Sequence, residues 1–193
     1  MQCERPAVGS STMNVRELER KLSRRSYEEL DNDMAAFDDA VLLELLDSRS
    51  IKVGDTAASL LSRRGKTNAI VDSVLAGHVS TKVGKIRAIN ILSSAGTSCV
   101  RAREAYLSLL YDKNHDVVDS ALFGLVFLQD RRSIGAIRDA MATQTEGSET
   151  HARCLTAIEA LQQQDPFIFS PYYHDAGDVW GLDKQRFGDR IGW

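Results

Sequence analysis

The sequence predicts an all-α protein, an α-solenoid of about four helix pairs with a helix before them and an aromatic tail after them. Three observations lead to this fold class. The 193-residue chain has only three prolines, Pro6, Pro166 and Pro171, and the uninterrupted stretch between the first two suits helices joined by short turns. Apolar residues recur at helical spacing, and the alternation typical of strands is nowhere sustained. The third observation is an internal repeat.

The elements can be placed in order along the chain. The pair Asn14 and Glu17 has the spacing of an N-terminal cap, so a helix is expected over about Val15 to Arg25. Ser26 and Glu29 show the same spacing, and a further helix is expected near Asn32 to Leu46. Seven more amphipathic runs each predict one helix of roughly three to four turns. Their apolar faces span 53–61, 70–75, 86–92, 100–111, 117–125, 134–141 and 155–161.

Four of these helices can be set in register. Each contains a polar residue followed by alanine, and successive copies lie 31, 33 and 36 residues apart: Thr56-Ala57, Arg87-Ala88, Ser120-Ala121 and Thr156-Ala157. One turn later stands a small or aliphatic residue (Leu60, Ile91, Gly124, Ala160), and a leucine follows it (Leu61, Leu92, Leu125, Leu161). A period in this range, with two helices per unit, indicates an α-solenoid. The alternative is a plain helical bundle in which small residues recur by chance.

The stretch from Gly124 to Ile137 resembles HEAT-like repeats, in which one repeat's second helix passes through an Asp-Arg turn, here Asp130-Arg131, into the next first helix. Asp116-Val117-Val118 resembles the family's start of a second helix, although Asp119 stands where the family has a basic residue. Arg153 and Ala157 match the last repeat. The resemblance covers about Asp33 to Gln164 and implies that the second helices line a concave face.

That implied face supplies candidate contact residues. Opposite the alanine–leucine stripe, two rows of equivalent positions are expected to face solvent: Ser59, Asn90, Phe123 and Glu159, then Ser62, Ser93, Val126 and Gln162. Phe123 and Val126 stand out because the helix from about Asp116 to Leu128 is apolar nearly all round, so it is either buried or binds something. The alternative is that internal packing or the tail covers them.

The two ends of the chain differ from its middle. Residues 1–13 are expected to be a disordered N-terminus, 14–165 the HEAT-like repeat domain and 166–193 an aromatic C-terminal cap segment. The last 28 residues hold seven of the thirteen Phe, Tyr and Trp side chains. We expect this segment either to cap the last repeat's apolar face or to contact a partner directly, with Trp180 as a candidate contact.

Charge is segregated although the net charge is only −3. Residues 31–47 carry six acidic groups and no basic one, whereas residues 48–103 carry ten basic groups against two acidic ones. A solenoid turns sequence blocks into surface blocks, so Arg63, Lys85 and Arg87 are expected in one basic patch that attracts an anionic partner. The alternative is solvated surface with local ion pairs. An acidic protein surface is preferred to nucleic acid, because the pI is 5.8 and the basic block has no aromatic residue for base stacking.

Motifs for catalysis are absent. There is no phosphate-binding glycine loop and no Gly-x-Ser-x-Gly. His151 with Cys154 offers too few metal donors. His174 with Asp175 and Asp178 is the only dense cluster of ligand types, but a loop with His-Asp caps turns far more often than it binds metal or does acid–base work, so neither a metal nor another cofactor is expected. We therefore expect a protein without enzymatic activity.

The expected function is binding of another protein, including an inhibitory or immunity-type role, through the concave face and the basic patch. The alternative is a nucleic-acid-binding or DNA-glycosylase-like HEAT-repeat protein. The chain has no long apolar run, no secretory signal pattern and three widely spaced cysteines, so a cytoplasmic protein without membrane contact is expected.

Overall fold

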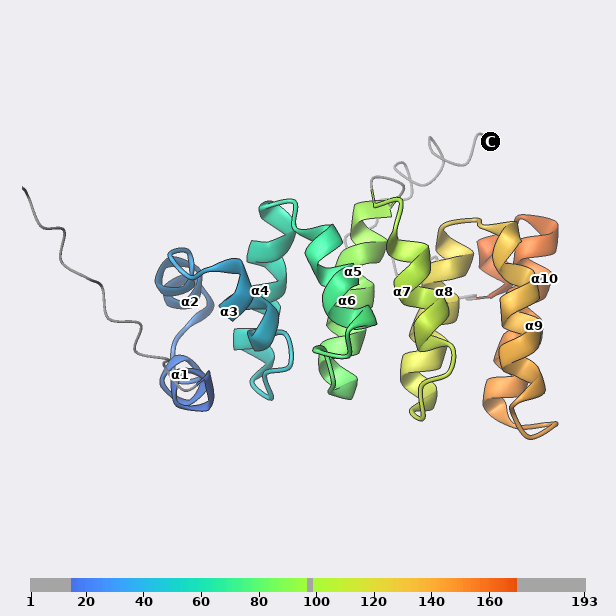
Figure 1. Ribbon diagram of the computed structural model, residues 1–193, viewed down its shortest axis with the longest axis horizontal. Coiled ribbons are helices and arrows are strands. Elements are labelled where there is room, and N and C mark those ends of the chain that lie inside the picture. The colour runs from blue at the N-terminus through green and yellow to red at the C-terminus, as the bar shows by residue number, and fades with distance from the viewer. Residues whose placement is uncertain (1–14, 97–98, 170–193) are drawn as a thin grey trace, which may run out of the picture.

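The computed structural model describes residues 15–96 and 99–169 (Figure 1). Within those ranges the secondary structure is helical and no strand occurs, so the predicted all-α class is confirmed for the described chain. The ten α-helices are α1 Val15–Leu22, α2 Tyr27–Met34, α3 Asp39–Leu45, α4 Ile51–Arg63, α5 Thr67–Leu75, α6 Lys82–Ala95, α7 Ala102–Leu109, α8 His115–Phe127, α9 Ile134–Ala142 and α10 Glu149–Gln163. Short 3-10 turns include η2 Arg131–Ser133 and η3 Pro166–Ile168.

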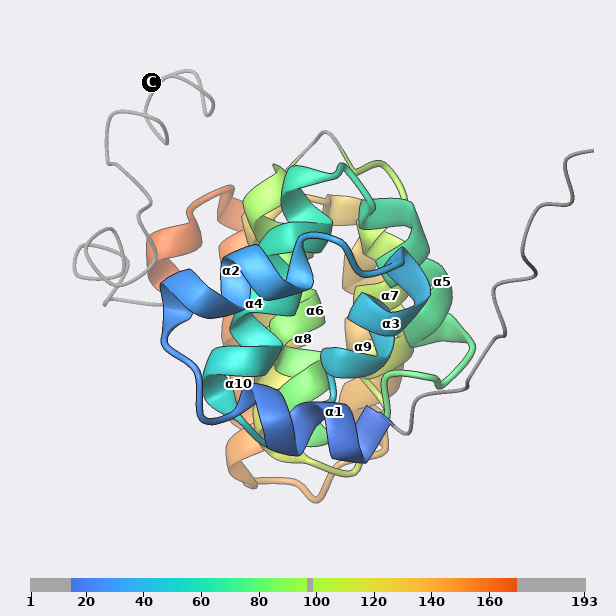
Figure 2. The ribbon, with the colours of Figure 1, turned by 90° about the vertical axis from the view of Figure 1, so that its left-hand side faces the viewer.

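The helices follow one another along the long axis in chain order, from α1 and α2 at one end to α9 and α10 at the other (Figure 1). α4, α6, α8 and α10 contact one another in succession and form one layer, while α5 contacts α7 in a second layer. Across the layers, α3 packs on α4, α5 on α6, α7 on α8 and α9 on α10. The view along the row separates α4 and α10 on one side from α5 and α7 on the other (Figure 2).

Burial follows the register found in the sequence. The four alanines and the four leucines of the aligned helices α4, α6, α8 and α10 are all fully buried. Burying one leucine side chain stabilises the fold by about 1.5–3 kcal/mol. The small position between them allows close packing: at Gly124 an added Cβ would lie 2.7 Å from the Tyr106 ring of α7. The alanine–leucine stripe is therefore the seam on which neighbouring helices pack.

The single helix predicted over about Asn32 to Leu46 is instead two helices, α2 and α3, separated by a turn. The guanidinium of Arg64 holds this turn, because it donates to the carbonyl oxygens of Ala35 and Phe37 at 2.7 and 2.8 Å. It also lies 2.8 Å from the carboxylate of Asp39, the first residue of α3. The last carbonyl groups of a helix have no hydrogen-bond partner within the helix. An arginine from elsewhere in the chain that donates to them therefore stabilises the end of a helix at a point where the apolar periodicity alone predicts that it continues.

Polar caps fix where several helices begin. The capping box predicted at Ser26 and Glu29 is confirmed: the Ser26 hydroxyl accepts from the Glu29 amide, and the Glu29 carboxylate accepts from the Ser26 amide at 2.8 Å. The side chains of Thr81, Asn114 and Ser148 each accept from one first-turn amide and so cap α6, α8 and α10. These caps satisfy amides that the first helical turn cannot pair internally.

Carboxylates from earlier in the chain also hold the start of later helices. Glu19 of α1 accepts from the Arg49 and Ser50 amides, at 2.8 and 3.3 Å, just before α4. Asp47 accepts from the Ser80 amide at 2.8 Å and from Thr81 just before α6. The Glu19 and Asp47 contacts span similar lengths of chain, so each connects one helix pair to the start of the next by the same kind of hydrogen bond.

Parts of the sequence-based prediction fall outside the described residues. These are the N-terminus 1–13, the capping residue Asn14, Trp180 and the cap segment beyond residue 169. The described beginning of that segment packs on α10, where η3 lies and where Pro166 and Phe169 are buried.

Candidate protein-binding groove

Two adjoining concavities lie over the outer surfaces of α4, α6 and α8. The first, of about 400 Å³, is lined by Asp55, Ala58, Ser59, Ser62 and Arg63 of α4 and by Arg87, Asn90, Ile91 and Ser94 of α6. The second, of about 250 Å³, is lined by Ile86, Ile89, Asn90, Ser93 and Ser94 of α6 and by Asp119, Ser120, Phe123 and Phe127 of α8. Asn90 and Ser94 belong to both. We call the combined surface the α4–α6–α8 groove.

Helix register explains why these side chains meet. Ser59, Asn90 and Phe123 stand at the same position of α4, α6 and α8, three residues after the polar residue that precedes the aligned alanine. The alanine–leucine stripe points inward, so this position emerges on the opposite side of each helix. Ser59 is exposed, whereas Asn90 and Phe123 are half-buried. The structure therefore brings these three sequence-predicted residues onto one surface.

One end of the groove is aromatic. The rings of Phe123 and Phe127, one turn apart on α8, stack with their centroids 6.3 Å apart and their planes 15° from parallel. Both rings are half-buried, and Ile86 of α6 lines the same concavity. Phe127 was missed by the sequence reasoning, although its i, i+4 spacing from Phe123 could have found it.

The other end of the groove is polar, and its charged residues, Asp55, Arg63 and Arg87, all lie in ion pairs. Ser59 and Ser62 of α4 are exposed, and the half-buried Asn90 follows on α6. Hydroxyl and amide groups can both donate and accept hydrogen bonds. This end can therefore bond to the backbone or to polar side chains of a bound segment.

Val126 does not belong to the groove. It is fully buried, and Ser93 of the same predicted row is only 9% exposed. The prediction that this second row faces solvent is wrong at these two positions. Val126 is covered because α8 packs against α6, α7 and α10, and the Ser93 hydroxyl lies in the interior, 3.0 Å from the Tyr106 hydroxyl. Ser62 and Gln162, the outer members of the row, are exposed.

Arg87 is also misplaced by the sequence reasoning, because it is 6% exposed and lies in the interior. Its Nε lies 2.8 Å from an Asp55 carboxylate oxygen, and its Nη1 donates to the carbonyl oxygens of Leu46 and Ser48 at 2.9 and 2.7 Å. The guanidinium lies so close to α4 that a Cβ at Gly54 would come within 2.1 Å of Nη1. Arg87 is therefore a clamp between helix pairs, unavailable to a partner.

The basic block as a whole is largely paired. Eight of its ten cations form ion pairs with carboxylates. Arg63 pairs with Asp31 and Lys85 with Asp112, so both neutralise acidic groups of neighbouring helices. Burial raises the pKa of Asp112, but hydrogen bonding from Lys85 and the Asn114 amide lowers it more, so the net pKa lies below its ordinary value. The local ion pairs offered as the alternative describe this region better than an open basic patch.

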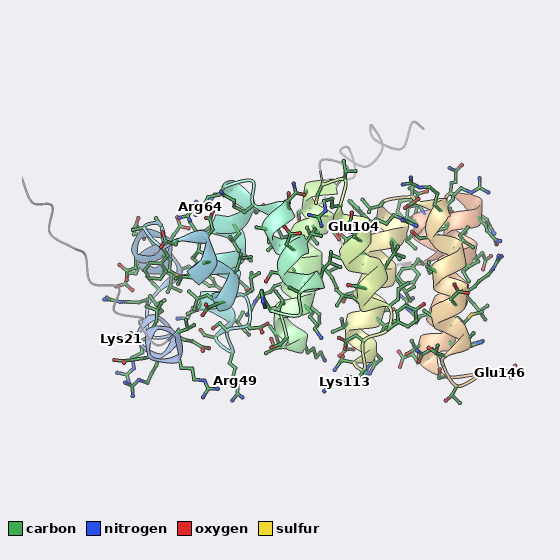
Figure 3. All side chains as sticks on the ribbon, viewed as in Figure 1. Lys21, Arg49, Arg64, Glu104, Lys113 and Glu146 are labelled. Atoms are coloured by element: carbon green, nitrogen blue, oxygen red, sulfur yellow. The ribbon has the colours of Figure 1, made fainter. Side chains whose placement is uncertain are left out.

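Unpaired positive charge lies instead on α1 and in the turn that follows it. Arg20 and Arg24 are exposed, and neither forms an ion pair within the described chain. They line an open concavity of about 930 Å³ together with Phe37. Lys21 on the same helix and Arg49 before α4 project from the edge of the molecule (Figure 3). Sequence reasoning missed this cluster because α1 also carries acidic residues, which lower its net charge.

The far wall of the groove connects to the end of the described chain. Asp119, which lines the aromatic concavity, forms an ion pair with Arg153 of α10. The Arg153 guanidinium also donates to the Phe169 carbonyl oxygen at 2.9 Å and lies 3.8 Å from the centroid of the Phe169 ring. Such cation–π contacts contribute about 0.5–1 kcal/mol at exposed sites and more where water is excluded.

Metal-ligating side chains do not gather within the described chain. No group of three or more His, Cys, Asp and Glu side chains there could hold a metal ion. Cys154 is buried, which raises the pKa of its thiol, with a smaller contribution from Asp119. His174, Asp175 and Asp178 lie outside the described residues. No described helix is long and apolar enough to cross a membrane.

Comparison with known proteins adds no relative: no family model, no curated protein and no solved structure matches this chain.

Proposed function

We propose that this chain is a HEAT-like α-solenoid that binds another protein along the α4–α6–α8 groove and performs no catalysis. The observation that carries the proposal is the groove itself, which runs across three helices of one layer and ends at the Phe123–Phe127 pair. Support for the repeat architecture comes from the shared burial register of four helices and from the ordered contacts between neighbouring pairs.

The chemistry of the groove suits a protein segment with one apolar anchor. A large apolar side chain of the partner would pack against Phe123 and Phe127, and buried aromatic contacts of this kind dominate binding energy at interfaces. Ser59 and Asn90 would bond polar groups along the rest of the segment. Because Arg87 and Arg153 already neutralise Asp55 and Asp119, the groove itself requires no strongly charged partner.

The expectation of an acidic partner surface now rests on the exposed positive charge of α1 and of the turn that follows it. Arg20 and Arg24 provide exposed positive charge at the N-terminal end of the row, away from the aromatic end of the groove. Acidic groups flanking the partner's anchor segment would approach this helix and speed association at low salt. Nucleic acid is a weaker candidate, because most cations of the central block are already paired with carboxylates.

The test uses matched asparagine variants of the full chain. A partner is first identified by co-purification with the native protein, and its affinity is then measured for Asn90→Arg and Asn68→Arg. Asn68 is exposed on α5, in the other layer, so the control adds the same charge outside the groove. The proposal predicts at least a tenfold loss for Asn90→Arg, equivalent to about 1.4 kcal/mol, and native affinity for Asn68→Arg. Equal affinities for the two variants would contradict the proposed site.

A further inference from the structure

We infer that residues 170–193 of this same chain dock into the α6–α8 end of the groove, with an aromatic side chain against Phe123 and Phe127. The groove then has a built-in occupant that a partner must displace. Three features of the structure carry this inference: where the described chain ends, what size and character the aromatic concavity has, and which residues follow.

The described chain ends beside the concavity. Phe169 is fully buried and is held by Arg153 through its carbonyl oxygen and its ring. Arg153 in turn contacts Asp119, which lines the concavity one turn before Phe123 on α8. Arg153 therefore links Phe169, after which the chain continues, to the wall of the aromatic concavity. The end of the described chain lies on the side of α10, away from α5 (Figure 2).

The concavity is suited to a side chain. Its volume is about 250 Å³, below the roughly 300–1,000 Å³ typical of small-molecule sites. Its lining combines the stacked phenylalanine rings and Ile86 with polar side chains that include Ser120 and Asn90. An aromatic ring with a polar tip, such as tyrosine, would meet both kinds of surface.

The residues that follow Phe169 have the required chemistry and reach. The 24 residues from 170 to 193 include five aromatic side chains, beginning with Tyr172 and Tyr173. Three or four residues of extended chain span up to about 10–14 Å. The first two aromatic side chains after the anchored Phe169 can therefore reach the next helix of the layer, and Trp180 can follow along the groove.

A tethered occupant acts at a high effective concentration, on the order of millimolar for short flexible links. A partner that uses the same aromatic concavity would bind more weakly while the tail is in place. This regulatory consequence rests on the proposed function, whereas docking of the tail does not. The two are tested separately, because docking can be measured without any partner.

Fluorescence of the full chain provides the first test. Both tryptophans of the protein, Trp180 and Trp193, lie in the tail, so their emission reports on this segment alone. We expect blue-shifted emission protected from acrylamide in the native chain, and red-shifted, quenchable emission in Phe123→Ala. Phe37→Ala is the matched control, because Phe37 is also half-buried but lies before α3 at the other end of the row. Emission that is solvent-exposed in the native chain, or unchanged in Phe123→Ala, would overturn the inference.

Disulfide trapping locates the docked segment independently. In a Cys3→Ser background, the pair Ser120→Cys and Tyr173→Cys should form an intramolecular disulfide on mild oxidation. The control pair, Thr143→Cys and Tyr173→Cys, should not, because Thr143 is exposed just after α9, which packs on α10 in the layer opposite to that of α8. Equal trapping of both pairs, no trapping, or a disulfide only between two chains would overturn the intramolecular assignment. None of these outcomes tests binding of a partner protein. The proposed function is tested separately, by the affinities of the Asn90→Arg and Asn68→Arg variants.

Discussion

Arg87 of α6 lies with its Nε 2.8 Å from a carboxylate oxygen of Asp55 on α4, and its side chain is 7% exposed. The same guanidinium donates to the carbonyl oxygens of Leu46 and Ser48 in the turn before α4. One side chain therefore joins the end of α3, the start of α4 and the body of α6. This contact converts a residue expected at the surface into part of the connection between helix pairs.

Removal of this clamp should be costly. Arg87→Ala leaves the Leu46 and Ser48 carbonyls without their donor, and each unsatisfied buried group costs about 1–3 kcal/mol. We predict a loss of roughly 3 kcal/mol in the free energy of unfolding, measured by urea denaturation. Arg63→Ala is the control, because its pair with Asp31 is exposed and should contribute about 0–1 kcal/mol. Equal losses for the two variants would show that the clamp has no special role.

Gly54 should be required by the same contact. A Cβ at this position would lie 2.1 Å from Arg87 Nη1, and the carbonyl bonds keep that group from moving aside. Gly54→Ala should therefore destabilise the native protein but much less in an Arg87→Ala background, as a double-mutant cycle would show. At Gly135 in α9 an added Cβ meets open space, so Gly135→Ala should stabilise by about 0.5–1 kcal/mol. A Gly54→Ala variant as stable as the native chain would contradict the close approach.

The two apolar residues predicted together on α8 should behave differently. Val126 is fully buried, so Val126→Ala should lower the free energy of unfolding by about 2 kcal/mol and leave partner affinity unchanged. Phe123 is half-buried in the groove, so Phe123→Ala should remain folded and weaken partner binding. Urea denaturation and titration calorimetry on both variants check the contrast. A Phe123→Ala chain that unfolds would assign this ring to the core instead.

Lowering the pH should weaken the hydrogen bonds that Glu19 of α1 accepts just before α4. Burial raises the pKa of Glu19, but hydrogen bonds from Ser48, Ser50 and Arg49 lower it more, so the folded-state pKa is below its ordinary value. A depressed carboxyl pKa contributes stability that is complete above the unfolded value of about 4.3 and is lost as the pH falls through the folded value. The stability difference between the native chain and Glu19→Gln should hold from pH 7 to about 5 and shrink below about 4. Glu17→Gln, at an exposed position, is the control; a difference independent of pH would refute the assignment.

Two truncations should separate anchoring of the tail from docking of the tail. A stop after Gln164 removes the buried Pro166 and Phe169, so it should lower the melting temperature and expose dye-binding apolar surface. A stop after Phe169 keeps the Arg153 contacts, so its melting temperature should lie closer to that of the full chain. Thermal unfolding of the three chains, followed by circular dichroism, makes the comparison. If the chain that stops after Gln164 melts as the full chain does, the segment does not cap the last helices.

The parts of the fold that depend on local sequence patterns could be predicted from the sequence. The alanine–leucine stripe repeats along the chain, so its register could be aligned by inspection, and burial follows it in four helices. The break between α2 and α3 could not be found in this way. It depends on Arg64, which lies 27 and 29 residues from the carbonyls of Phe37 and Ala35 that it bonds. Periodicity contains no information about such a contact.

In the candidate site too, positions set by helix register could be predicted from the sequence, and positions set by contacts between distant residues could not. Ser59, Asn90 and Phe123 were predicted because equivalent positions of equivalent helices emerge on one surface. Arg87 was misplaced because net charge by sequence block ignores the carbonyls and carboxylates that folding brings within reach. Val126 was misplaced because α8 is apolar nearly all round, so its sequence does not distinguish the face covered by neighbouring helices from the face left open.

Hydrogen–deuterium exchange of the complex with a co-purified partner tests the central claim most directly. If a protein binds along the α4–α6–α8 groove, amides in peptides covering 51–63, 82–95 and 115–127 should exchange more slowly in the complex, and those of α5 and α7 should be unchanged. Slower exchange confined to α5 and α7, or none in any of these helices, would contradict the account.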